Sequence, residues 1–400
     1  MKPGKWAKLL FVAAPLLIGF GAGCGDFWQA PNTGTGTCTT NCTTASSSNF
    51  YILDGGSSPG IVGASIVSGV LTTISGSPWT VQGLPYSMAI DPAGNFLIVS
   101  TTSGVFSFPI TNGTLGTAVT VSTDQAGAVQ VDATSSWLIE AIAGTGGVTM
   151  GAIPIDPTTG AGNGSEQNVS FTVANASLQS NRMVISGDNL NIFVSLGAGG
   201  TVVVPFNAAP AAGANPLSSK ATTIAVATTG GSSLSVAVDP GTTPRLFYIG
   251  ETLGNTAGTS GGLRVFNYSS LGGTLTQATG SPIASGGLAP NFILPIDAGK
   301  YVYAANGQGT SAGNIAGFTI TASSATPAVY TVATDTTTAA GEQPLGMAED
   351  STDTFVFEVG TAGSPYFDAY TFDATSLGQL DSQVTATAAG SSVAIVAAPQ

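Results

Sequence analysis

Short apolar segments separated by polar turns run along most of the chain, and residues 86–99 show the pattern most clearly. The apolar block Met88-Ala89-Ile90 leads into Asp91-Pro92-Ala93-Gly94, and the apolar run Phe96-Leu97-Ile98-Val99 follows. Asp at the first position, Pro at the second and Gly at the fourth are typical of a type I turn. The segment therefore predicts two strands joined by a tight turn, and the second strand should be buried on both faces.

The same unit recurs along the chain. Its Asp residues stand at positions 91, 132, 188, 239, 297 and 350, so successive copies are 41, 56, 51, 58 and 53 residues apart. Most copies continue into a third apolar segment, at 105–110, 202–206, 263–266, 315–320 and 369–372. Four short strands with their loops need a period of this length, which is typical of the blades of a β-propeller.

The two ends of the repeat region complement each other. Residues 49–53 match the second strand of a unit that has no first strand, and residues 392–396 match a first strand with nothing after it. Together they complete one more unit, which gives seven. The sequence thus predicts a seven-bladed β-propeller of four-stranded blades, closed by N- and C-terminal strands that share one blade, because closure removes the exposed sheet edges. An open β-solenoid is the alternative fold.

The composition supports an all-β fold class and argues against one class of partner. Hydrophobic residues make up 43% of the chain and charged residues only 7%, too few to cover the solvent faces of helices. The formal net charge is −13, and beyond the first eight residues the basic side chains are scattered: Arg182, Lys220, Arg245, Arg264 and Lys300. Because these five cations form no basic patch in the sequence, we expect no nucleic-acid partner.

Residues 1–23 have the features of an export signal. Lys2, Lys5 and Lys8 precede an apolar run at 9–20 that is too short to span a bilayer as a helix. Gly21-Ala22-Gly23-Cys24 resembles the lipobox of bacterial lipoproteins, although Gly21 replaces the usual aliphatic residue. This resemblance implies that Cys24 is lipidated and, with Gly25 after it, that the protein is anchored extracytoplasmically at the outer membrane or cell surface. A secretory signal in which Cys24 is incidental is the alternative.

Residues 24–48 are rich in Thr, Ser and Gly and predict a flexible tether before the propeller domain, residues 49–400. Cys38 and Cys42 lie inside this tether. In an oxidising compartment they predict a disulfide, whose small loop would constrain the chain little. A metal site there is disfavoured because the chain has no histidine and no further thiols nearby.

Several segments resemble one bacterial protein family. Residues 69–78 and 273–282 share the pattern Gly-x-Leu-Thr ending in Gly-Ser-Pro, and Tyr301-Val302-Tyr303-Ala304-Ala305-Asn306 has a related character. With Ala89–Gly94, these segments resemble the seven-bladed lactonase-like (6-phosphogluconolactonase-type) and YVTN-repeat propellers, over residues 50–397. The resemblance implies the fold. Lactonase activity in that family would use an acid/base set that includes histidine, and this chain has none.

The candidate site residues are therefore few. Glu140, Glu251 and Glu358 end second strands and would be the general acids and bases if they converged, with Arg182 and Arg245 as cations. The turn Asp residues are interpreted as turn caps. Side chains at the start of the inner strands face a propeller's central channel, which makes Tyr86, Arg182, Asn291 and Gln343 the candidate ligand-facing residues. No catalytic residue, metal ligand or cofactor motif is assigned.

We interpret the protein as a lipid-anchored binding or interaction propeller without catalysis, because it has a tether, low charge and no histidine. Its partner would be a small molecule, a glycan or an envelope protein. The membrane would be reached only through the N-terminal lipid, and we expect a monomer. Two alternatives remain open, a lactonase-like hydrolase or isomerase that uses carboxylate and Arg residues in the channel, and a purely structural envelope protein.

Overall fold

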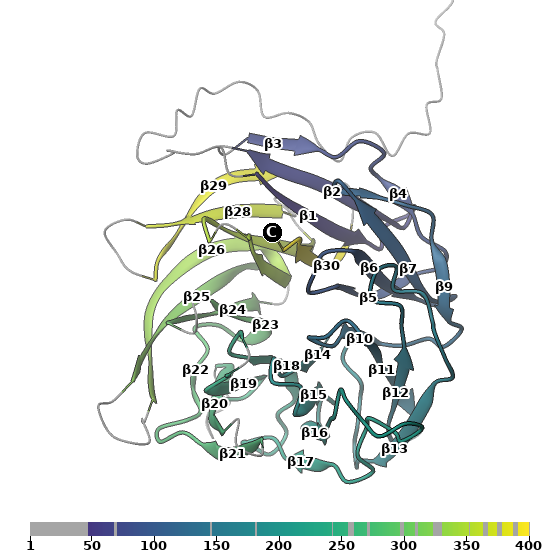
Figure 1. Ribbon diagram of the computed structural model, residues 1–400. Helices are drawn as coiled ribbons and strands as arrows, with labels where there is room; N and C mark the ends of the chain where they lie inside the picture. The colour runs from purple at the N-terminus through teal and green to yellow at the C-terminus, as the bar shows by residue number, and fades with distance from the viewer. Residues whose placement is uncertain are drawn as a thin grey trace, which may run out of the picture.

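The computed structural model is a ring of β-sheets (Figure 1). It describes residues 47–67, 70–144, 146–180, 182–241, 243–254, 260–269, 273–296, 300–308, 311–322, 330–351, 353–362, 367–373, 378–386 and 391–399. The predicted signal, most of the predicted tether, Cys24, Cys38, Cys42 and Asp297 lie outside these residues. Within them every regular element is a strand, and no helix there has the length and apolar character needed to cross a membrane.

Blade 2 shows how the repeated unit folds. Its inner strand β5 (Pro85–Ile90) pairs with β6 (Phe96–Thr101), which pairs with β7 (Gly104–Thr111). The outer edge consists of β8 (Thr114–Leu115) and β9 (Val119–Ser122), both paired with β7. All six residues of β6 are buried, as the unbroken apolar run predicts, because β5 and β7 flank it and the neighbouring blades cover both faces.

Blades 3, 4 and 5 repeat this order. Blade 3 contains β10 (Ala128–Val131), β11 (Trp137–Gly144), β12 (Gly147–Pro154) and β13 (Gln167–Thr172). Blade 4 contains β14 (Met183–Ile185), β15 (Asn191–Ser195), β16 (Thr201–Pro205) and β17 (Thr222–Ile224). Blade 5 contains β18 (Ser233–Val238), β19 (Leu246–Glu251), β20 (Gly262–Ser269) and β21 (Thr274–Gln277), with β22 (Ile283–Ala284) also on β20.

Blades 6 and 7 share one long strand. Blade 6 contains β23 (Ala289–Ile296), β24 (Tyr301–Gln308) and β25 (Ser311–Ala322), and blade 7 contains β27 (Phe355–Ala362), β28 (Phe367–Phe372) and β29 (Leu380–Ala386). The first part of β26 (Tyr330–Glu349) pairs with β25, and its last part, from Glu342, pairs with β27. One strand is therefore the outer edge of blade 6 and the inner strand of blade 7.

Blade 1 is built from both ends of the described chain. Its order is β30 (Ser392–Ala397), β1 (Ser47–Asp54), β2 (Gly60–Val67) and β3 (Val70–Thr73), with β4 (Trp79–Thr80) also on β2. Figure 1 shows β30 on the inner side of β1. The predicted closure is confirmed, and the described residues form seven antiparallel blades. The inner strands contact one another in the circular order β5, β10, β14, β18, β23, β26, β30.

The hydrophobic core lies between adjacent blades rather than at one centre. Phe50 of β1 stacks on Phe367 of β28 with ring centroids 5.1 Å apart, and Phe193 of β15 stacks on Phe247 of β19 at 4.0 Å. Each pair joins neighbouring blades, 7 with 1 and 4 with 5. Because every blade buries both faces against its neighbours, the middle strands have no polar face, which explains the low charge content of the chain.

Most of the described turn Asp residues act as predicted. Asp91 accepts a hydrogen bond from Asn95 N at 3.0 Å, and Asp132 accepts from Trp137 N at 2.7 Å. Asp350 accepts from Thr354 N at 2.7 Å, so these three side chains cap the turns. Asp239 likewise accepts a backbone hydrogen bond, from Arg245, and it also accepts from the side chains of Arg245 and Tyr248.

Candidate functional site

Arg182 stands directly before β14 and reaches across the ring of inner strands. Its Nη2 donates a 2.9 Å hydrogen bond to the carbonyl of Leu345 in β26, and its guanidinium lies 5.6 Å from the ring centroid of Phe292 in β23. Only 7% of Arg182 is exposed, and this burial lowers its pKa to about 10, which keeps it protonated at neutral pH. Arg182 therefore connects blade 4 with blades 6 and 7 across the centre of the ring.

The other predicted ligand-facing residues also lie where the inner strands begin. Asn291 of β23 donates through Nδ2 to the carbonyl of Pro344 in β26 at 3.1 Å, which joins blades 6 and 7. Gln343 accepts from the Thr361 hydroxyl at 3.2 Å, and Tyr86 of β5 is half-buried. Two of the four side chains thus hold inner strands together, and a role toward a ligand stays a prediction for all four.

Glu140, Glu251 and Glu358 do not converge. Each is buried, and each belongs to the second strand of a different blade. Glu140 lies on the side of β11 that packs against blade 2, Glu251 on the side of β19 that packs against blade 4, and Glu358 on the side of β27 that packs against blade 6. The expectation that they could share one acid/base site has no support in this geometry, because three separate blade interfaces hold them.

Glu251 is held by neighbours on both blades. Its carboxylate accepts from the backbone N of Ala227 at 3.1 Å and from Arg264 Nη1 at 3.4 Å. Burial raises the pKa of Glu251, while the Ala227 N–H and the Arg264 charge oppose that shift. This arrangement ties the loop after β17 to blade 5, so Glu251 acts as a structural acceptor.

Glu358 lies opposite Asp368, on the adjacent strand β28. Both carboxyl groups are buried, and the Tyr370 hydroxyl lies 3.1 Å from Asp368 Oδ2 and also 3.1 Å from the carbonyl oxygen of Ala339. Burial raises the pKa of Asp368 to about 7. A protonated Asp368 fits this geometry, because it would donate to Tyr370 while the single hydroxyl proton of Tyr370 bonds to Ala339.

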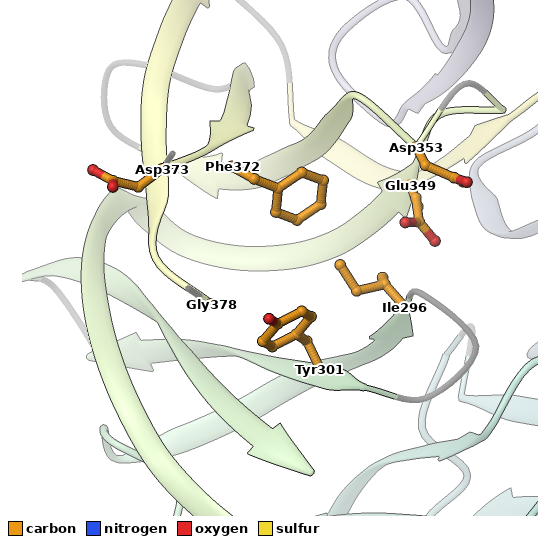
Figure 2. A pocket seen from close by; sticks show the side chains of 7 residues that line it. All are labelled: Ile296, Tyr301, Glu349, Asp353, Phe372, Asp373 and Gly378. Carbon is orange, nitrogen blue, oxygen red and sulfur yellow. The ribbon is translucent and has the colours of Figure 1, made fainter. Parts of the chain in front are cut away.

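A pocket of about 280 Å³ opens between blades 6 and 7, on the side of the ring where inner strands β23 and β26 end. It is lined by Ile296, Tyr301, Glu349, Asp353, Phe372, Asp373 and Gly378. Figure 2 shows the rings of Phe372 and Tyr301 and the side chain of Ile296 around the gap, with Glu349 and Asp353 together at one end. The Asp373 carboxylate points away from the gap.

Apolar walls with acceptors at one end can hold a small molecule that has an apolar face and several hydrogen-bond donors. An anionic phosphate ester would meet Glu349 and Asp353, so the pocket disfavours it electrostatically. Sequence reasoning missed this pocket. Its lining comes from strand ends in blades 6 and 7, and the only available signal was the cluster of acidic residues in the turn of the sixth repeat, at 349, 350 and 353.

Similarity to known proteins is found in the fold. No protein-family model matches the chain, and the search of curated proteins found no match. The fold is similar to a protein proposed to be a 6-phosphogluconolactonase from Bacteroides fragilis, with TM-score 0.68 and 16% identity over 89% of this chain and 99% of that one. It is also similar to the periplasmic gluconolactonase of Pseudomonas aeruginosa, with TM-score 0.66 and 17% identity over 88% and 99%. A Desulfotomaculum acetoxidans protein of unknown function has TM-score 0.62 and 11% identity over 89% and 100%. At these identities the likeness establishes the seven-bladed fold.

Proposed function

We propose that this protein is a binding propeller without catalysis, and that its ligand occupies the pocket between blades 6 and 7. The observation that carries the proposal is the pocket itself, in which Tyr301, Phe372 and Ile296 form apolar walls and Glu349 and Asp353 supply acceptors. Carbohydrates combine an apolar ring face with hydroxyl donors, and aromatic rings with carboxylates match both features. A neutral or cationic glycan is therefore the first ligand class to test.

The placement of the carboxylates supports binding over hydrolysis. Glu140, Glu251 and Glu358 are buried in three blade interfaces, and Glu251 is held by Arg264 and Ala227. The chain also contains no histidine. A lactone hydrolase needs a group that activates water beside the substrate carbonyl, and the three strand carboxylates cannot act together there.

The proposal includes the location that the N-terminal sequence predicts. With Cys24 lipidated and residues 24–48 as the tether, the propeller would be displayed outside the cytoplasm, where free glycans and envelope polymers are present. Radiolabelled palmitate incorporated into the wild type, and not into Cys24→Ser, would support the anchor.

Binding is tested with purified chain against a panel of neutral, cationic and anionic oligosaccharides, by titration calorimetry and by change in Tm. We expect binding to a neutral or cationic member, weakened about tenfold or more by Tyr301→Ala or Phe372→Ala, since a lost aromatic contact costs about 1–2 kcal/mol. Leu84→Ala, an exposed apolar residue beside β5, is the control and should bind as wild type. Unchanged affinity in both aromatic variants would contradict this pocket.

A lactonase-like hydrolase is the second candidate, because one structural neighbour is a gluconolactonase. In this pocket Glu349 or Asp353 would be the general base, and the substrate would be a lactone without phosphate. Turnover of a lactone panel, lost in Glu349→Gln or Asp353→Asn and unaffected in Glu251→Gln, would replace the binding proposal with this one.

A further inference from the structure

Three carboxylates meet at the interface between blades 2 and 3, away from the pocket described above. Asp124 follows β9 of blade 2, whereas Glu140 lies in β11 and Glu166 directly precedes β13, both in blade 3. One carboxylate oxygen from each residue lies within 4.8 Å of the other two. Asp124 and Glu166 are half-buried, so solutes can reach the cluster from outside, and Glu140 is fully buried behind them.

Glu140 occupies a position that blades 2, 4 and 5 fill with an aliphatic side chain, although blade 7 also has a glutamate there, Glu358. One backbone hydrogen bond closes the turn between the first and second strands, and it aligns the blades with one another. It joins Asp132 N to Trp137 O in blade 3, and its counterparts join Asp91 N to Phe96 O, Ser186 N to Asn191 O and Asp239 N to Leu246 O. We then compare the residue three positions after the one whose carbonyl accepts this bond. It is Glu140 in blade 3, and it is Val99, Val194 and Ile249 in blades 2, 4 and 5. Those three aliphatic residues are buried in core clusters, so a carboxylate at this position needs a specific reason.

Among the described residues, neither carboxylate oxygen of Glu140 receives a well-formed hydrogen bond, and neither does Oε1 of Glu166. The Ser122 hydroxyl is near enough to Glu140 to oppose part of the rise in its pKa that burial causes. A buried carboxylate normally receives several hydrogen bonds or a positive charge, and burial without either is costly. Ion pairs lie elsewhere, between Arg264 and Glu251 and between Arg245 and Asp239. Within the described part of the chain no basic side chain forms an ion pair with the cluster, so its negative charge is not offset there.

Gly151 creates the space in which these groups meet. In the register across blade 3, Glu140 of β11, Gly151 of β12 and Asn168 of β13 lie in one row. A Cβ atom at Gly151 would lie 2.2 Å from Glu166 Oε1 and 3.0 Å from Asn168 Oδ1. The missing side chain thus lets Glu166 lean over the sheet toward Glu140, and it brings a fourth oxygen donor, the Asn168 amide, to the rim.

We propose that Asp124, Glu140 and Glu166 bind a Ca²⁺ ion that joins blade 2 to blade 3. The donors are all oxygen, which hard divalent cations prefer. Ca²⁺ binds oxygen at about 2.3–2.6 Å, so its ligands can be about 4.6–5.2 Å apart across the ion, whereas Mg²⁺ at about 2.1 Å allows only about 4.2 Å. All three oxygens lie within 4.8 Å of one another, a spacing that Ca²⁺ accommodates, and Ca²⁺ tolerates an irregular set of oxygen ligands better than Mg²⁺, which requires near-octahedral geometry. The sequence alone predicted no metal, because the three residues belong to no known metal-binding motif.

This proposal does not depend on the pocket between blades 6 and 7. A Ca²⁺ ion at the blade 2–3 interface would stabilise the ring, and it would do so whether or not the protein binds glycans. The readouts are therefore Ca²⁺ binding and Tm, which are separate from the glycan and lactone assays.

The test uses full-length protein freed of metal with a chelator and returned to chelator-free buffer. We expect calorimetry to detect one Ca²⁺ site and about 5 mM CaCl₂ to raise Tm by about 3 °C or more, since saturation of a native-state site stabilises the folded chain. Glu140→Gln should abolish the Ca²⁺ heat and the Tm shift. Glu358→Gln is the matched control, because it removes a buried carboxylate from the corresponding position of blade 7, and it should keep both.

If Glu140→Gln does not fold, the same Ca²⁺ and Tm measurements are made on Asp124→Asn. Asp124 lies in a loop and is half-buried, so this change should leave the fold intact. Gly151→Ala should also weaken Ca²⁺ binding, because its Cβ occupies the space of Glu166. Absence of Ca²⁺ heat in the wild type would overturn the proposal, as would an equal Tm shift in the wild type and the Asp124→Asn variant. An equal response to Mg²⁺ would overturn the choice of ion.

Discussion

Ile52 of β1 lies directly opposite Ile395 of β30, so the first and last strands of the described chain are neighbours in one sheet. The register extends from Phe50 opposite Ala397 to Asp54 opposite Ser392. β30 also contacts β5 of blade 2 and β26 of blade 7. The inner strand of blade 1 is thus the link through which the ring closes, and its loss would expose one edge of β1 and the flanks of two further blades.

Removal of residues 391–400 should therefore destabilise the whole ring. The truncated chain loses the β1–β30 pairing and the buried contacts of Ala394 and Ile395, and we expect a Tm at least about 10 °C lower, with aggregation through the free edge of β1. Thermal unfolding by circular dichroism and light scattering measure both effects. A chain ending at Ala398 is the control, because it keeps all of β30. Near-normal Tm in the long truncation would contradict closure by β30.

The sequence was sufficient to predict this closure, because strand units have a local signature. The apolar run Phe96–Val99 and the turn at Asp91 each follow from residues a few positions apart, and the unmatched fragments at the two ends complete one unit. The continuous strand β26 was not predicted. Its first part pairs with β25, and nothing in residues 330–343 marks the point where it leaves blade 6 for blade 7.

The candidate sites were harder to predict, because they depend on which blades face each other. Arg182 was identified as a residue at the start of an inner strand, but its contact with Leu345 joins positions 163 residues apart. The cluster of Asp124, Glu140 and Glu166 depends on the register that puts Gly151 between Glu140 and Asn168. A repeat period gives the number of blades and the strand order, whereas side-chain convergence requires coordinates.

Arg182→Ala should lower stability, whatever ligand the protein binds. The change removes the hydrogen bond to Leu345 and the contact with Phe292, and it leaves a half-buried carbonyl without that donor. We expect a loss of about 1–3 kcal/mol, which is a fall in Tm of a few degrees. Arg182→Lys should recover little of the loss, because an ammonium lacks the planar face that lies against Phe292.

Thermal unfolding of the three proteins at one pH measures this effect. If Arg182→Ala had the same Tm as the wild type, the contacts of Arg182 with Leu345 and Phe292 would contribute little to stability. That result would favour a role for Arg182 in ligand binding.

Replacing Arg264 should lower the stability of the folded protein more than replacing its ion-pair partner Glu251 does. Arg264→Met removes the charge beside Glu251, which is buried, and also the hydrogen bond to the Ala225 carbonyl at 2.6 Å. We expect a loss of about 2–4 kcal/mol, since a charge left unpaired in a largely buried pair is strongly destabilising. Glu251→Gln should cost less, because a neutral amide oxygen still accepts from Ala227.

The double variant Glu251→Gln/Arg264→Met completes a mutant cycle for this pair. Coupling predicts that it loses less stability than the sum of the single variants, by about 1 kcal/mol or more. Denaturant titrations of the four proteins measure the coupling. Strict additivity would contradict a stabilising interaction between Glu251 and Arg264.

Asp368 should make the protein less stable as the pH rises from about 4 to about 7. Burial raises its pKa in the folded chain to about 7 from the usual 3.8, so across this range the folded state keeps a proton that the unfolded state has released. The groups that face it are Glu358 on β27 and Tyr370 on β28, whose pKa is also raised. The stabilisation is complete below pH 3.8, decreases with rising pH and is lost above about pH 7. Its upper limit is about 4 kcal/mol, from about 1.4 kcal/mol per pKa unit.

Asp368→Asn removes this dependence, because an amide stays neutral and can still hydrogen bond to Tyr370. We expect the variant to be more stable than the wild type at pH 8 and to lose less stability between pH 5 and pH 8. Urea unfolding midpoints at several pH values measure the difference, and Asp381→Asn, in the neighbouring strand β29, is the control. Parallel pH profiles for wild type and Asp368→Asn would show that Asp368 is ionised in the folded protein. The bonding order from Asp368 through Tyr370 to Ala339 would then be wrong.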